Sequence, residues 1–250
     1  MQVDSYQANK WGRSRSILWK FLDLVYPPKC CNCGRIGYHF CPECWSEIHT
    51  IKDPICRVCG IPLMKNSICL NCKTEPLAVD SIRSFGIYTG SLRQAIQRIK
   101  YSRDYSLAVM FIEPLLELVN QQNWTIDIII PVPLSAKRKR TRGYNQASWL
   151  AKPFAKSLMK PFSPEGLVRV KETKSQVGLS FKERKINVAG AFSANSDIVN
   201  SRNILLVDDV ITTGATLQAC AVSLKKAGAV KVYGITIART MNILDDFQIQ

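Results

Sequence analysis

Long hydrophobic runs are missing from this 250-residue chain. No stretch approaches the ~20 consecutive apolar residues that a helix needs to cross a bilayer, so we expect no membrane span. Lys20 and Asp23 interrupt the apolar positions of residues 1–28, and no small-residue cleavage site follows them, which argues against a secretory signal. These absences predict a cytoplasmic protein. Hydrophobic residues still make up 46% of the chain, enough for a core.

Acidic side chains are also scarce. The chain has 19 Asp and Glu residues against 34 Lys and Arg residues, and its formal net charge is +15. A basic balance favours polyanionic partners, either phosphate compounds or nucleic acid, but it does not determine a fold. Two phosphate-binding motifs are missing as well: G-x-x-x-x-G-K-[ST] for a nucleoside triphosphate and G-x-G-x-x-G for a dinucleotide. Any phosphate site must therefore use a different loop.

Cysteine, in contrast, is abundant and concentrated. Nine of the ten cysteines lie between positions 30 and 72, and Cys220 stands alone. A reducing cytoplasm leaves thiols available for metal binding, and a C-x-x-C pair can bring two thiolates to one tetrahedral zinc ion. The chain has four such pairs: Cys30 and Cys33, Cys41 and Cys44, Cys56 and Cys59, and Cys69 and Cys72.

These four pairs predict two structural zinc sites with four thiolates each. Sequential pairing, two pairs to each ion along the chain, is the simplest arrangement, but the sequence also allows interleaved pairing. Cys31 is left over. A thiol-rich segment without metal is the alternative interpretation. A module this small has too little apolar mass to fold unaided, so we expect zinc to supply much of its folding free energy.

The chain divides into three predicted parts: an N-terminal helical segment at 1–26 with an amphipathic helix at 14–26, a double zinc ribbon at 27–76, and an α/β domain at 77–250. Strands are predicted near 80–88, 126–131, 166–170, 203–207 and 230–237, and helices near 91–100, 104–121, 144–159 and 214–227. The unbroken apolar runs in the second and fourth strands are typical of strands covered on both faces. Alternation of strands with helices predicts a parallel sheet.

The stretch ILLVDDVITTGAT, 204–216, is the strongest candidate for a binding site. Ligands bind at the carboxyl ends of parallel strands, and the N–H groups at a helix start attract phosphate. Threonine hydroxyls around Gly214 add donors, while the glycine allows close approach. Asp208 and Asp209 suit ligand hydroxyls or a hydrated magnesium ion. We expect a group outside the chain to compensate these adjacent charges. A capped helix alone explains only one or two of the residues.

This stretch resembles the phosphoribosyl pyrophosphate (PRPP) loop of type I phosphoribosyltransferases. The resemblance implies that Asp208 and Asp209 form the catalytic pair and contact the 2′- and 3′-hydroxyls of ribose, while the loop holds the 5′-phosphate. The implied PRPP-binding residues are Asp208, Asp209, Val210, Thr212, Thr213, Gly214, Ala215, Thr216, Arg138, Arg142, Lys174 and Arg184.

Three further stretches extend the resemblance: YTGSLRQAIQRIKYSRD, PVPLSAKRKRTRGYNQA and TKSQVGLSFKERKINVAGAF. With the cysteine module, they make the chain similar to the ComF family of competence proteins. Ser135 and Tyr144 depart from that family's pattern, which often has His and Phe there. The resemblance implies a sheet of the type I phosphoribosyltransferase kind, preceded by a zinc-ribbon module. It also implies a role in DNA uptake during natural transformation, with possible partners in the competence machinery.

The resemblance also suggests how the site works. Magnesium, Arg142 and neighbouring basic residues would neutralise the departing pyrophosphate, and a flap at 171–192 would exclude water. The flap's candidate residues are Lys174, Gln176, Arg184 and Asn187. A solvated face is the alternative interpretation of Lys137, Lys139 and Arg140 in the basic run at 137–142. Lys100 and Tyr101 lie either near the site or at an exposed helix end.

Three functions are compatible with these features. The chain is a phosphoribosyltransferase with an unidentified acceptor, or a PRPP sensor without turnover. The third function, a single-stranded DNA-binding accessory that uses the zinc module and the basic face, is compatible with either of these. The third function predicts steep salt dependence, because each neutralised phosphate of a single strand adds about 0.7 to the slope of log K against log salt.

Overall fold

The computed structural model describes residues 27–65, 67–172 and 187–241. The helix predicted at 14–26 therefore lies outside the described residues, as do Lys174, Gln176 and Arg184 of the predicted flap. Within the described ranges, no helix combines the length and the apolar character that crossing a bilayer requires.

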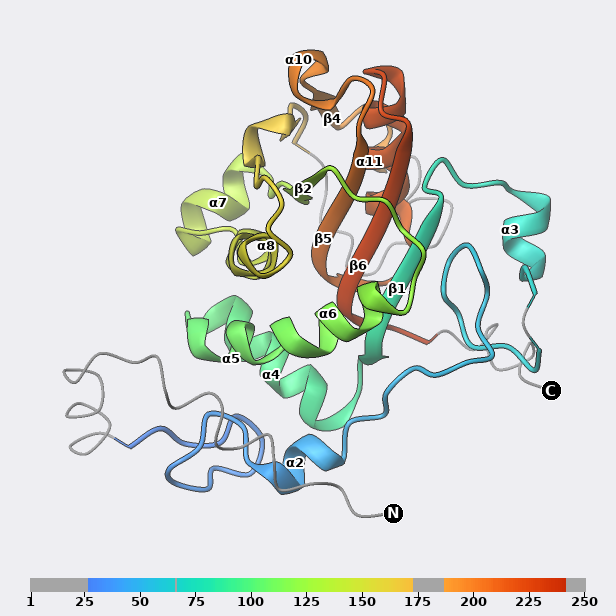
Figure 1. Cartoon of the computed structure of the whole chain (residues 1–250). Helices are drawn as coiled ribbons and strands as arrows, with labels where there is room; N and C mark the ends of the chain where they lie inside the picture. Colours follow the sequence, from blue (N-terminus) through green and yellow to red (C-terminus); the bar gives the residue numbers. More distant parts are fainter. Residues whose placement is uncertain (1–26, 66, 173–186, 242–250) are drawn as a thin grey trace.

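A four-stranded parallel sheet forms the centre of the molecule (Figure 1). Its strands lie in the order β1 (Ser81–Ile87), β6 (Lys231–Arg239), β5 (Asn203–Ile211) and β2 (Ile128–Pro131). All three pairings are parallel, and every residue of β2 is buried. The predicted α/β class with a parallel sheet is confirmed.

The strand predicted near 166–170 does not belong to this sheet. It forms β3 (Leu167–Arg169), which pairs antiparallel with β4 (Phe192–Ala194) in a separate two-stranded sheet. No strand is predicted at β4, whose first residue, Phe192, is the last residue of the predicted flap. Three-residue strands carry too little periodicity to reveal a partner.

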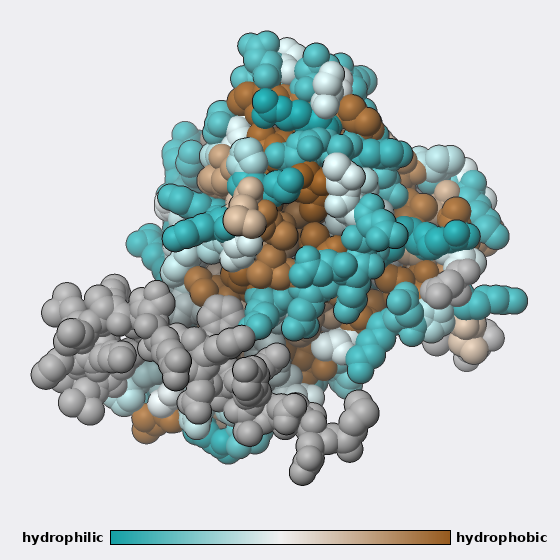
Figure 2. Space-filling view, in the orientation of Figure 1, coloured by the Kyte–Doolittle hydropathy of each residue, from teal (hydrophilic) through white to brown (hydrophobic). Residues whose placement is uncertain are grey.

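Helices cover both faces of the central sheet. One face packs against α4 (Gly90–Tyr101), α5 (Tyr105–Met110), α6 (Ile112–Asn120) and α8 (Gln146–Ser157), and the other packs against α11 (Ala215–Lys226). Successive residues of a strand point to opposite faces, so Leu205 joins the first core and Leu206 the second. In the same orientation, Figure 2 shows hydrophilic residues over much of the visible face, with hydrophobic residues between them.

The helix predicted at 104–121 is two helices. Phe111 ends α5 and begins α6, and its N–H donates to the carbonyl of Ala108 rather than continuing the α-helical pattern. Short elements complete the described fold: α2 (Pro42–Ser46), α3 (Leu70–Thr74), α7 (Ala136–Arg142), the 3-10 helix η1 (Pro164–Gly166) and α10 (Ser196–Val199).

The two cysteine clusters dock at different places on the α/β domain. The first packs Phe40 and Trp45 against Phe111. The second lies along β1, where Ile82 N–H donates to the Val58 carbonyl at 2.7 Å. Between them, the chain at 49–51 follows the outer edge of β1 through two backbone hydrogen bonds of 2.8 and 2.9 Å. The edge of β1 is therefore covered, which protects it from pairing with other chains.

Gly60→Ala should destabilise the second cluster's contact with β1. Gly60 has φ +73°, and an added Cβ would lie 2.4 Å from the Ile82 carbonyl oxygen. Gly37→Ala is a matched control, because Gly37 has φ +93° and nothing within 4 Å of such a Cβ. Both changes add left-handed strain of about 1–3 kcal/mol, but only Gly60→Ala adds a clash of about 1–3 kcal/mol.

Thermal unfolding measures the difference. For a chain of this size, about 1 kcal/mol shifts the midpoint by about 2–4 °C, so Gly60→Ala should unfold about 2–12 °C below Gly37→Ala. Equal midpoints would contradict the tight docking of this cluster on β1.

Candidate functional site

The eight paired cysteines form two clusters of four. Cys30, Cys33, Cys41 and Cys44 make the first, and Cys56, Cys59, Cys69 and Cys72 the second, each with its sulfur atoms within 4.8 Å of one another. Tetrahedral zinc with bonds of about 2.3 Å needs sulfur atoms about 3.8 Å apart. The Cys33–Cys41 and Cys59–Cys69 sulfur distances are 3.6 and 3.7 Å. The donor set fits zinc, the pairing is sequential, and Cys31 belongs to neither cluster.

Equivalent backbone hydrogen bonds support the two clusters. Cys41 N–H donates to Cys30 Sγ, and Cys69 N–H donates to Cys56 Sγ, both at 3.4 Å. Donors of this kind favour the thiolate form that binds metal. Four thiolates leave no open coordination position, so both sites are structural.

A polar cavity of about 940 Å³ lies at the carboxyl ends of β2 and β5. The end of α4, the chain at 132–146, the end of β3 and the start of α11 complete its wall. Its charged lining residues are the basic Lys100, Arg103, Lys137, Arg138, Arg142 and Arg169 and the acidic Glu172, Asp208 and Asp209. Six cations against three acids favour an anionic ligand.

The acidic pair lies inside β5 rather than beyond it. Pairing with β6 continues to Ile211, so the predicted strand end near 207 is four residues too early. Val207 and Val210 pack against the same core, and Ile211 against the other, although regular alternation would separate Val207 from Val210. This break in the strand period coincides with the acidic pair, and both carboxylates line the cavity.

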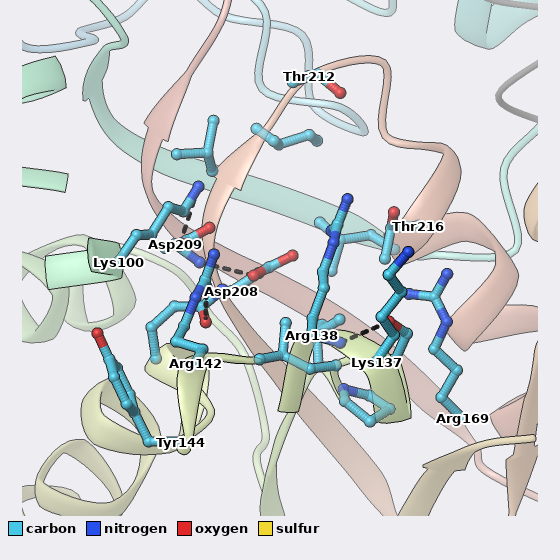
Figure 3. Close-up of a pocket in the computed structure, with 18 of the residues that line it drawn as sticks. Lys100, Lys137, Arg138, Arg142, Tyr144, Arg169, Asp208, Asp209, Thr212 and Thr216 are labelled. Carbon is cyan, nitrogen blue, oxygen red and sulfur yellow. Dashed lines mark hydrogen bonds and ion pairs between the residues drawn. The ribbon is translucent and has the colours of Figure 1, made fainter. Parts of the chain in front are cut away.

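Lys100 compensates the charge of Asp209 from within the chain. Its Nζ lies 3.1 Å from Asp209 Oδ2 (Figure 3), and Asp209 is only 3% exposed. The expectation was that a group outside the chain compensates the pair, whereas Asp209 has a partner within the chain. Burial alone would lower the pKa of Lys100, but the charges of Asp209 and Asp208 outweigh burial and raise it. Lys100 thus remains an ammonium ion at the site.

Asp208 is the second carboxyl group of the pair. Burial, reinforced by the negative charge of Asp209, raises the pKa of Asp208 to about 8. Its Oδ1 accepts a hydrogen bond of 2.8 Å from Asp209 N–H. The raised pKa favours the protonated form of Asp208, and a proton there reduces the repulsion between the two carboxyl groups.

The turn between β5 and α11 forms the second part of the site. Gly214 caps α11 with φ +78°, a left-handed conformation that glycine adopts without steric cost. Thr212, Gly214, Ala215 and Thr216 line the cavity. Thr213 is not among the lining residues, and its hydroxyl accepts from Ala215 N–H at 3.4 Å. The helix start thus faces the cavity as the sequence predicts, except for Thr213.

The basic run forms the short helix α7, which the sequence analysis did not predict. The Ser135 hydroxyl caps it by accepting from Arg138 N–H at 3.3 Å. No residue of α7 is buried. Lys139 and Arg140 do not line the cavity, which agrees with the solvated-face interpretation, whereas Lys137, Arg138 and Arg142 do line it. Val210 is a further predicted residue in the lining, whereas Lys174 and Arg184 lie outside the described residues.

Sequence reasoning missed Arg169 and Glu172, which both line the cavity. Burial and the nearby charge of Arg138 lower the pKa of Arg169. Glu172 Oε1 accepts from Lys137 N–H at 3.0 Å, and this hydrogen bond lowers the pKa of Glu172. Their position depends on the β3–β4 pairing, so the sequence offered no signal for them. Lys100 and Tyr101 both line the cavity, and Tyr101 is at the same time exposed at the end of α4.

Comparison with known proteins identifies a domain family and several relatives. Residues 21–73 match the family model described as the double zinc ribbon domain. Competence protein F of Haemophilus influenzae is 34% identical over 79% of this chain and 90% of its own length. DNA utilization protein YhgH of Escherichia coli is 30% identical over 87% of this chain and 100% of its own length.

A solved structure shows a more distant likeness. Adenine phosphoribosyltransferase from Thermoanaerobacter pseudethanolicus aligns with a TM-score of 0.35 and 16% sequence identity, over 56% of this chain and 83% of that one.

Proposed function

Because the chain belongs to the ComF family of competence proteins, we propose that it binds PRPP together with magnesium in the cavity beside Asp208 and Asp209. We further propose that it transfers the phosphoribosyl group to an acceptor in a process that handles DNA. The names of its relatives, competence protein F and DNA utilization protein YhgH, support the link to DNA.

The proposal rests on one observation: the acidic pair Asp208 and Asp209 and the start of α11 line the same cation-rich cavity. The start of α11 offers N–H groups and the Thr216 side chain to a 5′-phosphate. The acidic pair suits ribose hydroxyls, which can donate to carboxylate oxygens. Arg138 and Arg142 suit the pyrophosphate, since guanidinium groups bind phosphate oxygens with two hydrogen bonds at once.

Magnesium fits this donor set. Asp209 Oδ2 is buried and lies 3.1 Å from Lys100 Nζ. A carboxylate has lone pairs for about four interactions, so Asp209 can accept another one beside this ion pair. Magnesium commonly uses one or two carboxylates together with substrate phosphates. When bound, it would supply positive charge to the pyrophosphate.

The chain's own residues contribute mainly position and charge. Departure of pyrophosphate from the anomeric carbon leaves positive charge on the ribose, which Asp209 and Asp208 would face. Lys100 holds Asp209 in place and keeps its charge balanced before ligand arrives. The basic side chains of α7 would stabilise the leaving group, and fixed charges of this kind lower a barrier because they need no rearrangement during the reaction.

Asp209→Asn should weaken PRPP binding by about 10- to 150-fold, because a hydrogen bond to a charged group contributes about 1.5–3 kcal/mol. Calorimetric titration of PRPP with magnesium into the zinc-loaded protein measures this change. Asp197→Asn is the matched control, because Asp197 is an exposed acid at the start of α10, and it should bind as the wild type does. Thermal unfolding checks that the variants are folded.

A wild-type protein that does not bind PRPP would reject the proposed site. Equal affinity in Asp209→Asn would reject the role of the acidic pair. Release of pyrophosphate, assayed with nucleobases and with DNA as acceptors, then distinguishes the transferase from a PRPP sensor, since both use the same binding residues.

A further inference from the structure

Two turns contact each other at the mouth of the cavity. One follows α4, and the other joins α7 to α8. Tyr144 in the second turn donates its hydroxyl to the Ile99 carbonyl of α4 at 2.5 Å. Gly143 leaves the guanidinium of Arg103 only 3.4 Å from the position of a Cβ. The two turns therefore form one rim, although they are about 40 residues apart in the sequence.

Tyr101 presents an open aromatic ring on this rim. It lines the cavity but is 74% exposed. The Arg142 guanidinium lies over its ring, 5.3 Å from the centroid. By comparison, Tyr144 is stacked on Trp149 at 3.8 Å with an angle of 7° between the rings. The ring of Tyr144 is therefore packed against Trp149, whereas most of the surface of Tyr101 is accessible to a ligand.

The position of Tyr101 relative to the proposed ribose site is fixed by its neighbour. Lys100 points inward to Asp209, and Tyr101 is the next residue of the same helix end, at the cavity mouth. A group attached to a ribose beside Asp209 would leave the cavity past this rim. An aromatic ring with an adjacent guanidinium stacks well on a planar heteroaromatic ring, and such stacking contributes about 1–3 kcal/mol per base.

We propose that the exposed ring of Tyr101 is a stacking subsite for a nucleobase. The subsite extends the proposed function, because it names a nucleobase-bearing compound as the second ligand of the PRPP cavity. The base belongs either to a free nucleotide or to a single nucleic-acid strand. Both sources offer the same planar ring, and binding measurements can separate them.

Comparison of AMP with ribose 5-phosphate isolates the contribution of the base. Calorimetry on the zinc-loaded wild type should show AMP binding about 5- to 150-fold tighter than ribose 5-phosphate, the equivalent of about 1–3 kcal/mol. Tyr101→Ala should remove this advantage without changing the affinity for ribose 5-phosphate, and Tyr101→Phe should keep it. Tyr38→Ala, which removes an exposed tyrosine of the first zinc ribbon, should have no effect.

An oligothymidylate titration distinguishes the source of the base. If Tyr101→Ala weakens the oligonucleotide but not AMP, the stacked base belongs to a strand; the reverse assigns it to a nucleotide. If Tyr101→Ala changes neither, or if AMP binds no tighter than ribose 5-phosphate to the wild type and the oligonucleotide is unaffected, the subsite is rejected while the phosphoribosyl site stands. Failure of ribose 5-phosphate and PRPP to bind would instead reject the proposed function.

Discussion

Loss of zinc should lower the thermal midpoint of this protein by about 10–20 °C. Three ligands of the first site, Cys30, Cys41 and Cys44, belong to the main hydrophobic core, so opening that site exposes part of the core. Structural zinc contributes about 10–16 kcal/mol in isolated zinc-finger peptides. If about 5 kcal/mol of this contribution stabilises the whole chain, the midpoint falls by about 10–20 °C at 2–4 °C per kcal/mol.

Cys33→Ser and Cys31→Ser form a matched pair for this prediction. Of these two residues, Cys33 belongs to a cluster and Cys31 does not. Cys33→Ser should therefore lose one of two bound zinc ions and unfold at a lower temperature, whereas Cys31→Ser should keep both ions. Elemental analysis gives the zinc content, and scanning calorimetry gives the midpoint. Equal zinc content in the two variants would contradict the assignment of ligands. An unchanged midpoint after complete chelation would contradict the structural role.

Asp208→Asn should stabilise the protein in alkaline solution. The pKa of Asp208 is raised to about 8 from a usual 3.8, so between these values the folded state keeps a proton that the unfolded state has released. Stability therefore falls as pH rises from about 4 to about 8, by at most about 1.4 kcal/mol per pH unit. Asparagine does not titrate, so the variant avoids this loss.

Unfolding by urea at pH 5, 7 and 9 measures the effect. The free energy of unfolding of Asp208→Asn, relative to the wild type, should grow from pH 5 to pH 9. Asp197→Asn should show no such trend, because Asp197 is exposed. A stability difference that is constant across this range would show that Asp208 is ionised throughout. The same variant should bind PRPP weakly, a trade of stability for function that is common at binding sites.

Local sequence patterns were enough to predict the acidic pair, the glycine turn and the cysteine pairs, because each depends on residues close together in the chain. The Lys100–Asp209 ion pair joins residues from α4 and β5, and no local pattern reveals such a contact. The same holds for Arg169, whose place in the cavity depends on the β3–β4 pairing. The positions of Lys100 and Arg169 in the cavity therefore depend on tertiary contacts, which local sequence patterns do not reveal.

The sequence does not reveal the break between α5 and α6, and the reason is a different one. The buried residues of the two helices include Leu107, Ile112 and Leu115, with the buried Phe111 between them. Their spacing continues one apolar stripe through the break, so hydrophobic periodicity predicts a single helix. Only the backbone at Phe111 shows where the first helix ends.

Docking of the second cysteine cluster has a consequence for synthesis of the chain. Its contacts include a hydrogen bond from Arg239 to the Cys59 carbonyl. Arg239 ends β6, which is the last of the four sheet strands in chain order. Roughly 160 residues separate this cluster from β6, which a ribosome takes about 10–30 s to add at 5–20 residues per second. Until β6 is synthesised, the thiols of this cluster lack their final cover. Early capture of zinc would protect them from oxidation while the sheet is completed.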